Sequence, residues 1–261
     1  MSTRLALQVA YDGRRYAGWQ IQPDRPTVQA ALEAALTGIA GAAVKTICAG
    51  RTDAGVHALA QVVHFDAPSA RPLTAWVRGV NALLGDDVAV VRAWPVADDF
   101  HARFQASARR YGYLLRVGAV RDPLWSGRAG WSFRGLDHQV MRDAAQCLIG
   151  RHDFSSFRAA QCQARSPVRT ISRLSIRRRG DWLFIDIEAD AFLHHMVRNI
   201  VAALVAVGSG SCSRAWLEDL LHARDRRLGA PTFAPDGLYF LGPTYPQPGG
   251  PVVECDLGWL P

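Results

Sequence analysis

The chain has 261 residues, 49% hydrophobic and 20% charged, a balance typical of a folded globular protein rather than a disordered one. Lysine and arginine exceed aspartate and glutamate by 30 to 23, and Lys45 is the only lysine. The net charge of +7 therefore comes from arginine and favours a polyanionic partner such as nucleic acid. The five cysteines form no CxxC pair, and no apolar stretch reaches the length of a membrane span. We expect a cytoplasmic protein without a membrane segment.

The first hundred residues predict a β-α-β-β-α-β order. Apolar and polar residues alternate from Leu5 to Tyr11, as in a half-buried strand. Thr27 is a suitable N-cap for a helix that ends before Gly41. The expected elements are strands at 5–11, 44–49, 61–66 and 88–94 and helices at 28–39 and 73–84.

The same order begins again after residue 104. We expect strands at 111–117, 171–177, 182–188 and 237–241 and helices at 138–148, 193–207 and, as an extra element, 213–224. This order is that of the ferredoxin-like or RRM-like unit. The sequence thus predicts an α+β fold of two such repeats that share an extended antiparallel sheet, with domains at 1–104 and 105–261. The Pro- and Gly-rich residues 242–251 are expected to form an extended surface tail.

Two glycines bracket a charged loop between the second and third expected strands. Its sequence is Gly50-Arg51-Thr52-Asp53-Ala54-Gly55-Val56-His57-Ala58. Because glycine permits close backbone approach, such a loop can present the arginine and the aspartate to a ligand. A structural interpretation is also open, in which Asp53 caps a short helix that begins at Ala54, and spacing alone favours it.

The loop resembles, residue for residue, the signature of the tRNA pseudouridine synthase A family, in which the aspartate is the nucleophile. The segment from Tyr11 to Gln22 is similar to the family's YDGxxYxGWQxQ motif. Further similar segments are 27–29, 32–33, 100–104, 109–111, 152–157, 169–171, 192–201 and 237–239. The resemblance runs from about Leu5 to Tyr245. It departs at Ala202, where the family has glycine, and in the longer tail.

The resemblance implies isomerisation of uridine to pseudouridine at positions 38, 39 and 40 of the tRNA anticodon arm, by a homodimer that flips the target base. All atoms of uridine are retained, so no redox cofactor, metal or donor is expected. A carboxylate can add to C1′ or C6, or help to remove the C2′ proton, and the sequence leaves these routes open.

The resemblance also implies roles for five residues around a catalytic cleft between the repeats. Asp53 is the catalytic carboxylate, and Arg198 is the cation that keeps it ionised. Arg51 holds the target nucleotide or its phosphate. Tyr111 stacks on the extruded base and can move a proton, and Leu238 lines the uracil pocket. Each of the last four also has a structural interpretation, as a solvated arginine or a core residue.

Two further groups of residues bear on binding. His194 and His195 are adjacent, and adjacent side chains on a helix diverge, so we expect no metal site there. We expect six arginines to contact the RNA backbone rather than only solvent, namely Arg14, Arg15, Arg109, Arg110, Arg177 and Arg178.

Two rival functions fit part of the sequence. A non-catalytic RNA-binding module would use the same sheet and arginines, but it would not need the Arg-x-Asp loop between glycines. A nucleoside or glycoside hydrolase would in most cases need a second carboxylate about 5 to 10 Å from Asp53, and the sequence shows no clear partner.

Overall fold

The computed structural model describes residues 3–246, 250–253 and 255, and it divides into two compact units. Unit 1 contains the described residues up to Arg109 and those from Tyr239 onward, and unit 2 contains Arg110–Leu238. Residues 247–249 of the predicted tail lie outside the described residues. None of the described helices is long and apolar enough to cross a membrane.

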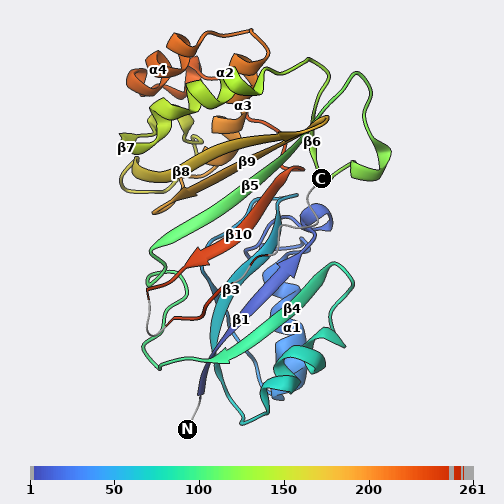
Figure 1. The fold of residues 1–261 in the computed structure, drawn as a ribbon. Coiled ribbons are helices and arrows are strands. Elements are labelled where there is room, and N and C mark those ends of the chain that lie inside the picture. The colour runs from blue at the N-terminus through green and yellow to red at the C-terminus, as the bar shows by residue number, and fades with distance from the viewer. Residues whose placement is uncertain (1–2, 247–249, 254, 256–261) are drawn as a thin grey trace. The chain divides into compact units, whose positions relative to one another are not determined.

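Unit 1 is built on a sheet with ferredoxin-like strand order (Figure 1). Its elements are β1 (Thr3–Tyr11), η1 (Gly13–Arg15), α1 (Val28–Ala40), β2 (Ile47–Cys48), β3 (His57–Ala67), the π-helical turn η2 (Ala75–Gly79), β4 (Val88–Pro95) and β10 (Leu238–Thr244). β1 pairs antiparallel with both β3 and β4, and β2 pairs antiparallel with β3. The predicted α+β class and element order are confirmed.

The helix α1 follows directly from its caps and its apolar stripe. The Thr27 hydroxyl accepts a hydrogen bond from the Ala30 N–H at 3.4 Å, and Gly41 ends the helix with a φ of 73°. Leu32 and Leu36 are completely buried. These features confirm the predicted helix.

The strand β2 is shorter than predicted because a helix side chain binds the residues before it. The buried Glu33 carboxylate accepts hydrogen bonds from the Thr46 N–H at 2.8 Å and from the Thr46 hydroxyl at 3.0 Å. Lys45 approaches the same carboxylate at 3.2 Å. Residues 44–46 therefore face α1 rather than a strand partner.

Both faces of β1 are buried, so the prediction of a half-buried strand is wrong. Ala6, on the side expected to be polar, packs in a cluster with Phe100, Ala102 and Tyr245. The Tyr245 hydroxyl donates to the Ala102 carbonyl at 2.7 Å. The predicted surface tail is also corrected, because residues 242–244 still belong to β10 and Tyr245 is buried.

Unit 2 combines further strands with three packed helices (Figure 1). Its elements are β5 (Ala108–Val117), η3 (Pro123–Trp125), β6 (Gly130–Ser132), α2 (His138–Ala145), η4 (Gln146–Leu148), β7 (Gly150–Asp153), η5 (Ser155–Phe157), β8 (Val168–Arg179), β9 (Trp182–Ala189), α3 (Met196–Gly208), α4 (Arg214–Ala223) and η6 (Arg226–Leu228). The strand order is β5-β9-β8-β7, and β6 pairs with β5 in parallel. β5, α2, β8, β9, α3 and α4 follow in the predicted order.

Three strands of the second half differ from the prediction. β6 and β7 were not expected. The β7 sequence Gly-Arg-His-Asp has no apolar alternation, and this strand forms by pairing with β8. β10 was expected to be the last strand of the second repeat. The Leu114 N–H donates to the Gly237 carbonyl at 2.8 Å, and β10 then pairs in parallel with β3 of unit 1 through Tyr239 and Phe240.

Candidate active site

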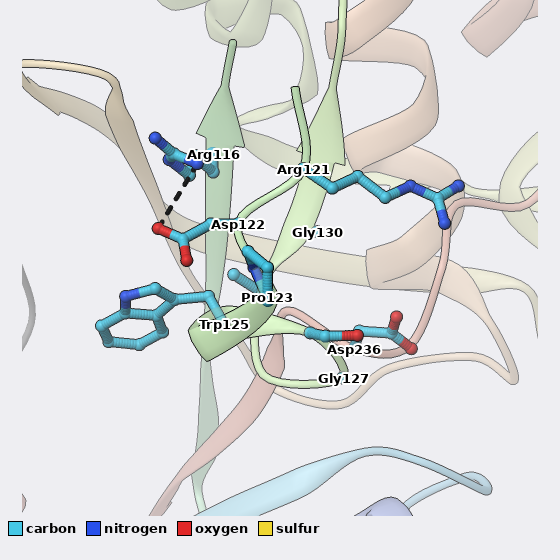
Figure 2. A pocket seen from close by; sticks show the side chains of 10 residues that line it. Arg116, Arg121, Asp122, Pro123, Trp125, Gly127, Gly130 and Asp236 are labelled. Carbon is cyan, nitrogen blue, oxygen red and sulfur yellow. Dashed lines mark ion pairs between the residues drawn. The ribbon is translucent and has the colours of Figure 1, made fainter. Parts of the chain in front are cut away.

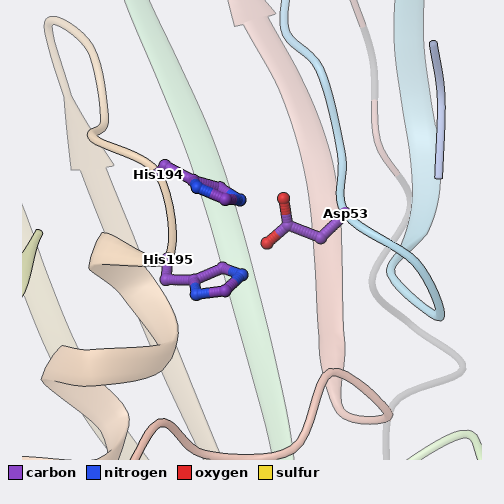
Figure 3. Close-up of side chains that lie close together, drawn as sticks. All are labelled: Asp53, His194 and His195. Carbon is purple, nitrogen blue, oxygen red and sulfur yellow. The ribbon is translucent and has the colours of Figure 1, made fainter. Parts of the chain in front are cut away.

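Asp53 lies in the loop that joins β2 to β3 (Figure 3). The Val56 N–H donates to the Asp53 carbonyl at 3.2 Å, and Gly55 has a φ of 77°, so residues 54 and 55 form a turn. No helix begins at Ala54, and the helix-cap interpretation of Asp53 is therefore wrong. The Asp53 side chain is half-buried, between the buried Thr52 and Val56.

The N-terminal motif fixes this loop through close backbone contacts. Gly18 has a φ of 101°, and a Cβ atom there would lie 2.7 Å from the Thr52 carbonyl oxygen and 3.1 Å from the Asp53 carbonyl carbon. A Cβ atom on Gly13 would overlap the Val56 carbonyl. The Trp19 N–H donates to the Thr52 carbonyl at 3.0 Å. Only glycine at these two positions allows the segments to pack so closely.

Buried side chains complete the support below the loop. The Tyr11 hydroxyl and the Thr52 hydroxyl are hydrogen-bonded at 2.8 Å, and burial raises the pKa of Tyr11 far above its usual value. The His57 ring stacks on Tyr239 with centroids 4.7 Å apart, and its Nδ1 accepts the Gly13 N–H at 3.2 Å. These groups hold the loop without using the Asp53 carboxylate.

Two arginines lie close to the ends of the loop and differ in exposure. Arg51 is exposed, and its charge opposes the burial that raises the pKa of the Cys48 thiol to about 11. Cys48 is therefore a neutral thiol at neutral pH and no rival nucleophile. Arg109, predicted to contact RNA, donates to the Ala49 carbonyl at 3.2 and 3.4 Å and to the Ala106 carbonyl at 2.9 Å. Its guanidinium braces the backbone.

Arg14 and Arg15 follow β1 and have different surroundings. Arg14 binds both oxygens of Asp12, at distances down to 2.7 Å. Partial burial raises the pKa of Asp12, but the hydrogen bonds from Arg14 outweigh this and hold it below its ordinary value. Arg15 is 84% exposed and lies 3.5 Å from Asp87. Arg15 is the more available of the two for a phosphate.

Tyr111 and Leu238 are buried in unit 2. Tyr111 lies on β5 with 8% of its surface exposed, and its ring meets Phe192 edge-on at 5.1 Å. Leu238 begins β10 with 5% exposed, and its N–H donates to the Pro235 carbonyl at 2.8 Å. Such burial fits core packing and also fits the wall of a base-binding pocket.

The first turn of α3 organises the segment 226–233. Arg198, the third residue of α3, donates from Nε to the Phe233 carbonyl at 2.7 Å. The next residue, Asn199, accepts hydrogen bonds from Arg226 at 3.1 Å and from the Thr232 hydroxyl at 2.8 Å. No role was expected for Asn199, and only its place beside Arg198 could have indicated one.

His194 and His195 do not lie on a helix, and the expectation that their side chains diverge is wrong. They lie in a turn before α3, where His195 has a φ of 62°. Their rings lie side by side with centroids 4.0 Å apart (Figure 3). A left-handed residue at the N-cap reverses the side-chain directions that helical spacing predicts.

The predicted RNA-contacting arginines of unit 2 fall into two classes. Arg110 forms a bidentate ion pair with the buried Asp186, at 2.9 and 2.7 Å. Arg177 and Arg178 are exposed near the β8–β9 turn, where Arg177 covers the Phe184 ring at 5.2 Å. Arg110 therefore supports the sheet, whereas Arg177 and Arg178 are open to a ligand.

Unit 2 also contains a cavity of about 410 Å³ beside β5 and β6 (Figure 2). The ion pair between Arg116 and Asp122, at 3.4 Å, lies on its wall. Trp125 also lines it and meets Trp182 edge-on at 4.8 Å. None of the predicted site residues lines this cavity.

Several residues for which no role was expected hold the candidate site in place. Gly13, Gly18 and Tyr11 hold the Asp53 loop, although the sequence marked Tyr11 only as a strand and motif residue and the two glycines only as part of a similar motif. Glycines that interrupt a polar loop were the available signal, because they mark positions of close backbone approach.

The sequence model of the family described as "tRNA pseudouridine synthase" matches residues 7–105 and 144–246. A tRNA pseudouridine synthase A from Bordetella petrii is 58% identical over 245 residues, which cover 93% of this chain and 91% of the relative. One from Chromobacterium violaceum is 58% identical over 258 residues and 98% of each chain. One from Dechloromonas aromatica is 57% identical over 93% of this chain and 92% of the relative. With its α+β fold, the chain therefore belongs to the tRNA pseudouridine synthase family, whose members are isomerases.

Proposed function

We propose that this chain converts uridine to pseudouridine at positions 38, 39 and 40 of the tRNA anticodon arm, with Asp53 as nucleophile. The observation that carries the proposal is the construction of the Asp53 loop. Gly13 and Gly18 fix its backbone, and no helix uses Asp53 as its cap. The loop also lies within the first segment that the family model matches.

The proposed chemistry needs one carboxylate and no added atoms. The bond from N1 to C1′ breaks, the uracil turns, and a bond from C5 to C1′ forms. C5 loses a proton and N1 gains one, so the product is an isomer of the substrate. Asp53 adds to C1′ or C6 and is released when the new bond is complete. The target base is flipped out of the stack to reach the carboxylate.

Four residues have supporting roles in this proposal. The exposed guanidinium of Arg51 binds the target nucleotide or its phosphate. The Tyr111 ring stacks on the flipped base, and the buried Leu238 contributes an apolar pocket wall. Arg198 supplies the positive charge that pairs with the catalytic carboxylate.

The proposal includes the assembly and the RNA-binding surface. The protein acts in the cytoplasm as a homodimer, which presents two copies of each RNA-binding surface. Arg15, Arg177 and Arg178 are exposed and meet the phosphate backbone. Arg14, Arg109 and Arg110 are bound to protein groups, so their contribution is to hold that surface in shape.

Tritium release from tRNA labelled at uracil C5 tests the function directly, because the isomerisation must lose that hydrogen. We expect the parent protein to release tritium, and Asp53→Asn to release at least about 10⁴-fold less while still binding tRNA. Asp86→Asn, at an exposed loop position, is the matched control and keeps parent activity. Parent-level release from Asp53→Asn would reject Asp53 as nucleophile.

Two further readouts address the substrate and the rival chemistry. Replacement of uridines 38, 39 and 40 together by cytidine should abolish release from an otherwise unchanged tRNA. Retained release would reject the anticodon-arm assignment. Free uracil in the reaction, in place of pseudouridine, would instead identify a hydrolase.

A further inference from the structure

The segment 97–107 lies between β4 and β5. Two of its residues are buried in the core, and a phenylalanine two positions further along is exposed. Phe100 and Ala102 are 1% and 0% exposed and pack in the cluster below β1. Phe104, two residues further, is 75% exposed. The Phe104 ring is therefore open to a flat apolar ligand.

The Phe104 ring is held in place by a neighbouring imidazole. It stacks on His101 with centroids 4.2 Å apart and planes 24° apart. The His101 Nδ1 accepts the N–H groups of Arg103 and Phe104, each at 3.2 Å, so the imidazole cannot turn freely. Burial and the charges of Arg4 and Arg103 lower the pKa of His101, which favours the neutral ring at pH 7.

A second histidine fixes the turn from below. The His64 Nδ1 accepts the Ala102 N–H at 3.1 Å, and its ring lies 4.8 Å from His101. Tyr245 donates to the Ala102 carbonyl from the other direction. The aromatic surface is therefore built in advance, and a ligand does not have to order it.

The segment 97–107 is tied to the base of the Asp53 loop. The Arg109 guanidinium that binds the Ala49 carbonyl also binds the carbonyls of Arg103 and Ala106. Ala49, four residues before Asp53, packs in the same cluster as Ala106. One side chain thus links the turn that carries Phe104 to the loop that carries the proposed nucleophile.

We propose that Phe104 is a stacking platform for an unpaired base of the RNA substrate, with the Arg103 guanidinium beside it for the adjoining phosphate. The Arg103 guanidinium lies over the Phe104 ring, with its central carbon 5.6 Å from the ring centroid, so a ligand that stacks on this ring lies within reach of a positive charge. Aromatic rings beside arginine are the common means of holding unpaired bases. Phe104 is here a positioning residue, and the inference rests on the proposed function only for the identity of the RNA.

Substitution at Phe104 separates stacking from simple apolar contact. We expect Phe104→Leu to weaken tRNA binding by roughly tenfold or more, and Phe104→Trp to restore it, because stacking needs a ring. Melting temperature and the single-turnover rate at saturating tRNA should stay near those of the parent. Phe133→Leu is the matched control, since Phe133 is 62% exposed with Arg134 at 5.4 Å but has no stacked histidine, and it should bind as the parent does.

Abasic substitutions in the anticodon arm identify the base. At one position, the abasic substitution should strongly weaken tRNA binding by the parent protein. The same substitution should not weaken binding by Phe104→Leu any further, because both changes remove the same stacking contact. Unchanged affinity in Phe104→Leu, equal losses in the Leu and Trp variants, or no abasic position that couples to Phe104 would each overturn the proposal. These are binding measurements, so they remain decisive even if the parent forms no pseudouridine.

Discussion

Two loops of the molecule are held in place by different means. The Asp53 loop of unit 1 is fixed by its main chain, through the close contacts with Gly13 and Gly18. The segment 118–129 of unit 2 has turn hydrogen bonds of its own and is tied to its surroundings by side chains, through the ion pair of Arg116 with Asp122 and the contact of Trp125 with Trp182. The family model matches the first loop and omits residues 106–143.

The difference shows how a loop can keep its side chains for a ligand. A loop braced by backbone contacts does not depend on its own charged side chains to hold its main chain in place. A loop braced by ion pairs uses its charges to hold itself, and such pairs on a surface contribute little. Changes in the backbone brace of the first loop should therefore cost far more than changes in the side-chain brace of the second.

Among changes to the two loop braces, the largest effect is expected from Gly18→Ala. A Cβ atom at Gly18 would lie 2.7 Å from the Thr52 carbonyl oxygen, and a φ of 101° is strained for alanine. Overpacking and backbone strain together should lower the free energy of unfolding by about 3 to 4 kcal/mol. Displacement of the Asp53 loop should slow tritium release by about 10²-fold. Urea unfolding and the release assay measure the two effects.

Gly41→Ala is the matched control for Gly18→Ala. Gly41 also has a positive φ, of 73°, but nothing lies within 4 Å of an added Cβ atom. Its cost should be limited to backbone strain, about 1 to 2 kcal/mol, with activity unchanged. Equal effects of the two substitutions would show that close contact with the Asp53 loop is unimportant.

A second prediction concerns the buried imidazole below the segment 97–107. Burial, with the charges of His101 and Arg4, lowers the pKa of His64 to about 4, against a weaker opposing effect of Asp66. In the unfolded chain His64 takes up a proton near pH 6.5. Stability is therefore full above about pH 6.5 and falls as the pH drops toward 4, by up to about 3 kcal/mol.

Urea unfolding at pH 7 and at pH 5 tests this assignment. His64→Asn keeps an acceptor for the Ala102 N–H. Whatever the stability of this variant at pH 7, its free energy of unfolding should fall less between pH 7 and pH 5 than that of the parent. His222→Asn, at an exposed position on α4, should leave the pH dependence unchanged. A parent slope retained by His64→Asn would assign the acid sensitivity to other groups.

The sequence predicted most of the fold but few of the contacts that hold the site. Caps and apolar spacing identified α1 because those signals are local, as at Thr27 and Gly41. The short β2 depended on Glu33, a distant carboxylate that captures Thr46, and helical periodicity cannot show such a partner. The resemblance located the Asp53 loop. The role of Gly18 could be seen only in the structure, because it depends on contact with the Thr52 backbone, 34 positions further along the chain.

A third prediction concerns the exposed arginines near the β8–β9 turn. Arg177→Glu combined with Arg178→Glu should weaken tRNA binding by about tenfold and reduce its dependence on salt, because fewer counterions are released. Arg71→Glu combined with Arg142→Glu makes the same change in net charge at exposed positions elsewhere. If both pairs weaken binding equally, the effect belongs to overall charge and not to these two side chains.

The smallest effect is expected from Asp122→Asn, which weakens the side-chain brace of the segment 118–129. Asp122 accepts the Leu124 N–H at 3.1 Å and lies 3.4 Å from Arg116, and both members of the ion pair are about a quarter exposed. Asparagine can still accept the N–H, and a partly exposed ion pair contributes about 1 kcal/mol or less. The free energy of unfolding should fall by no more than that, and tritium release should be unchanged. A large loss of activity in Asp122→Asn would show that this segment has a functional role despite its side-chain bracing, and the contrast between the two loops would then fail.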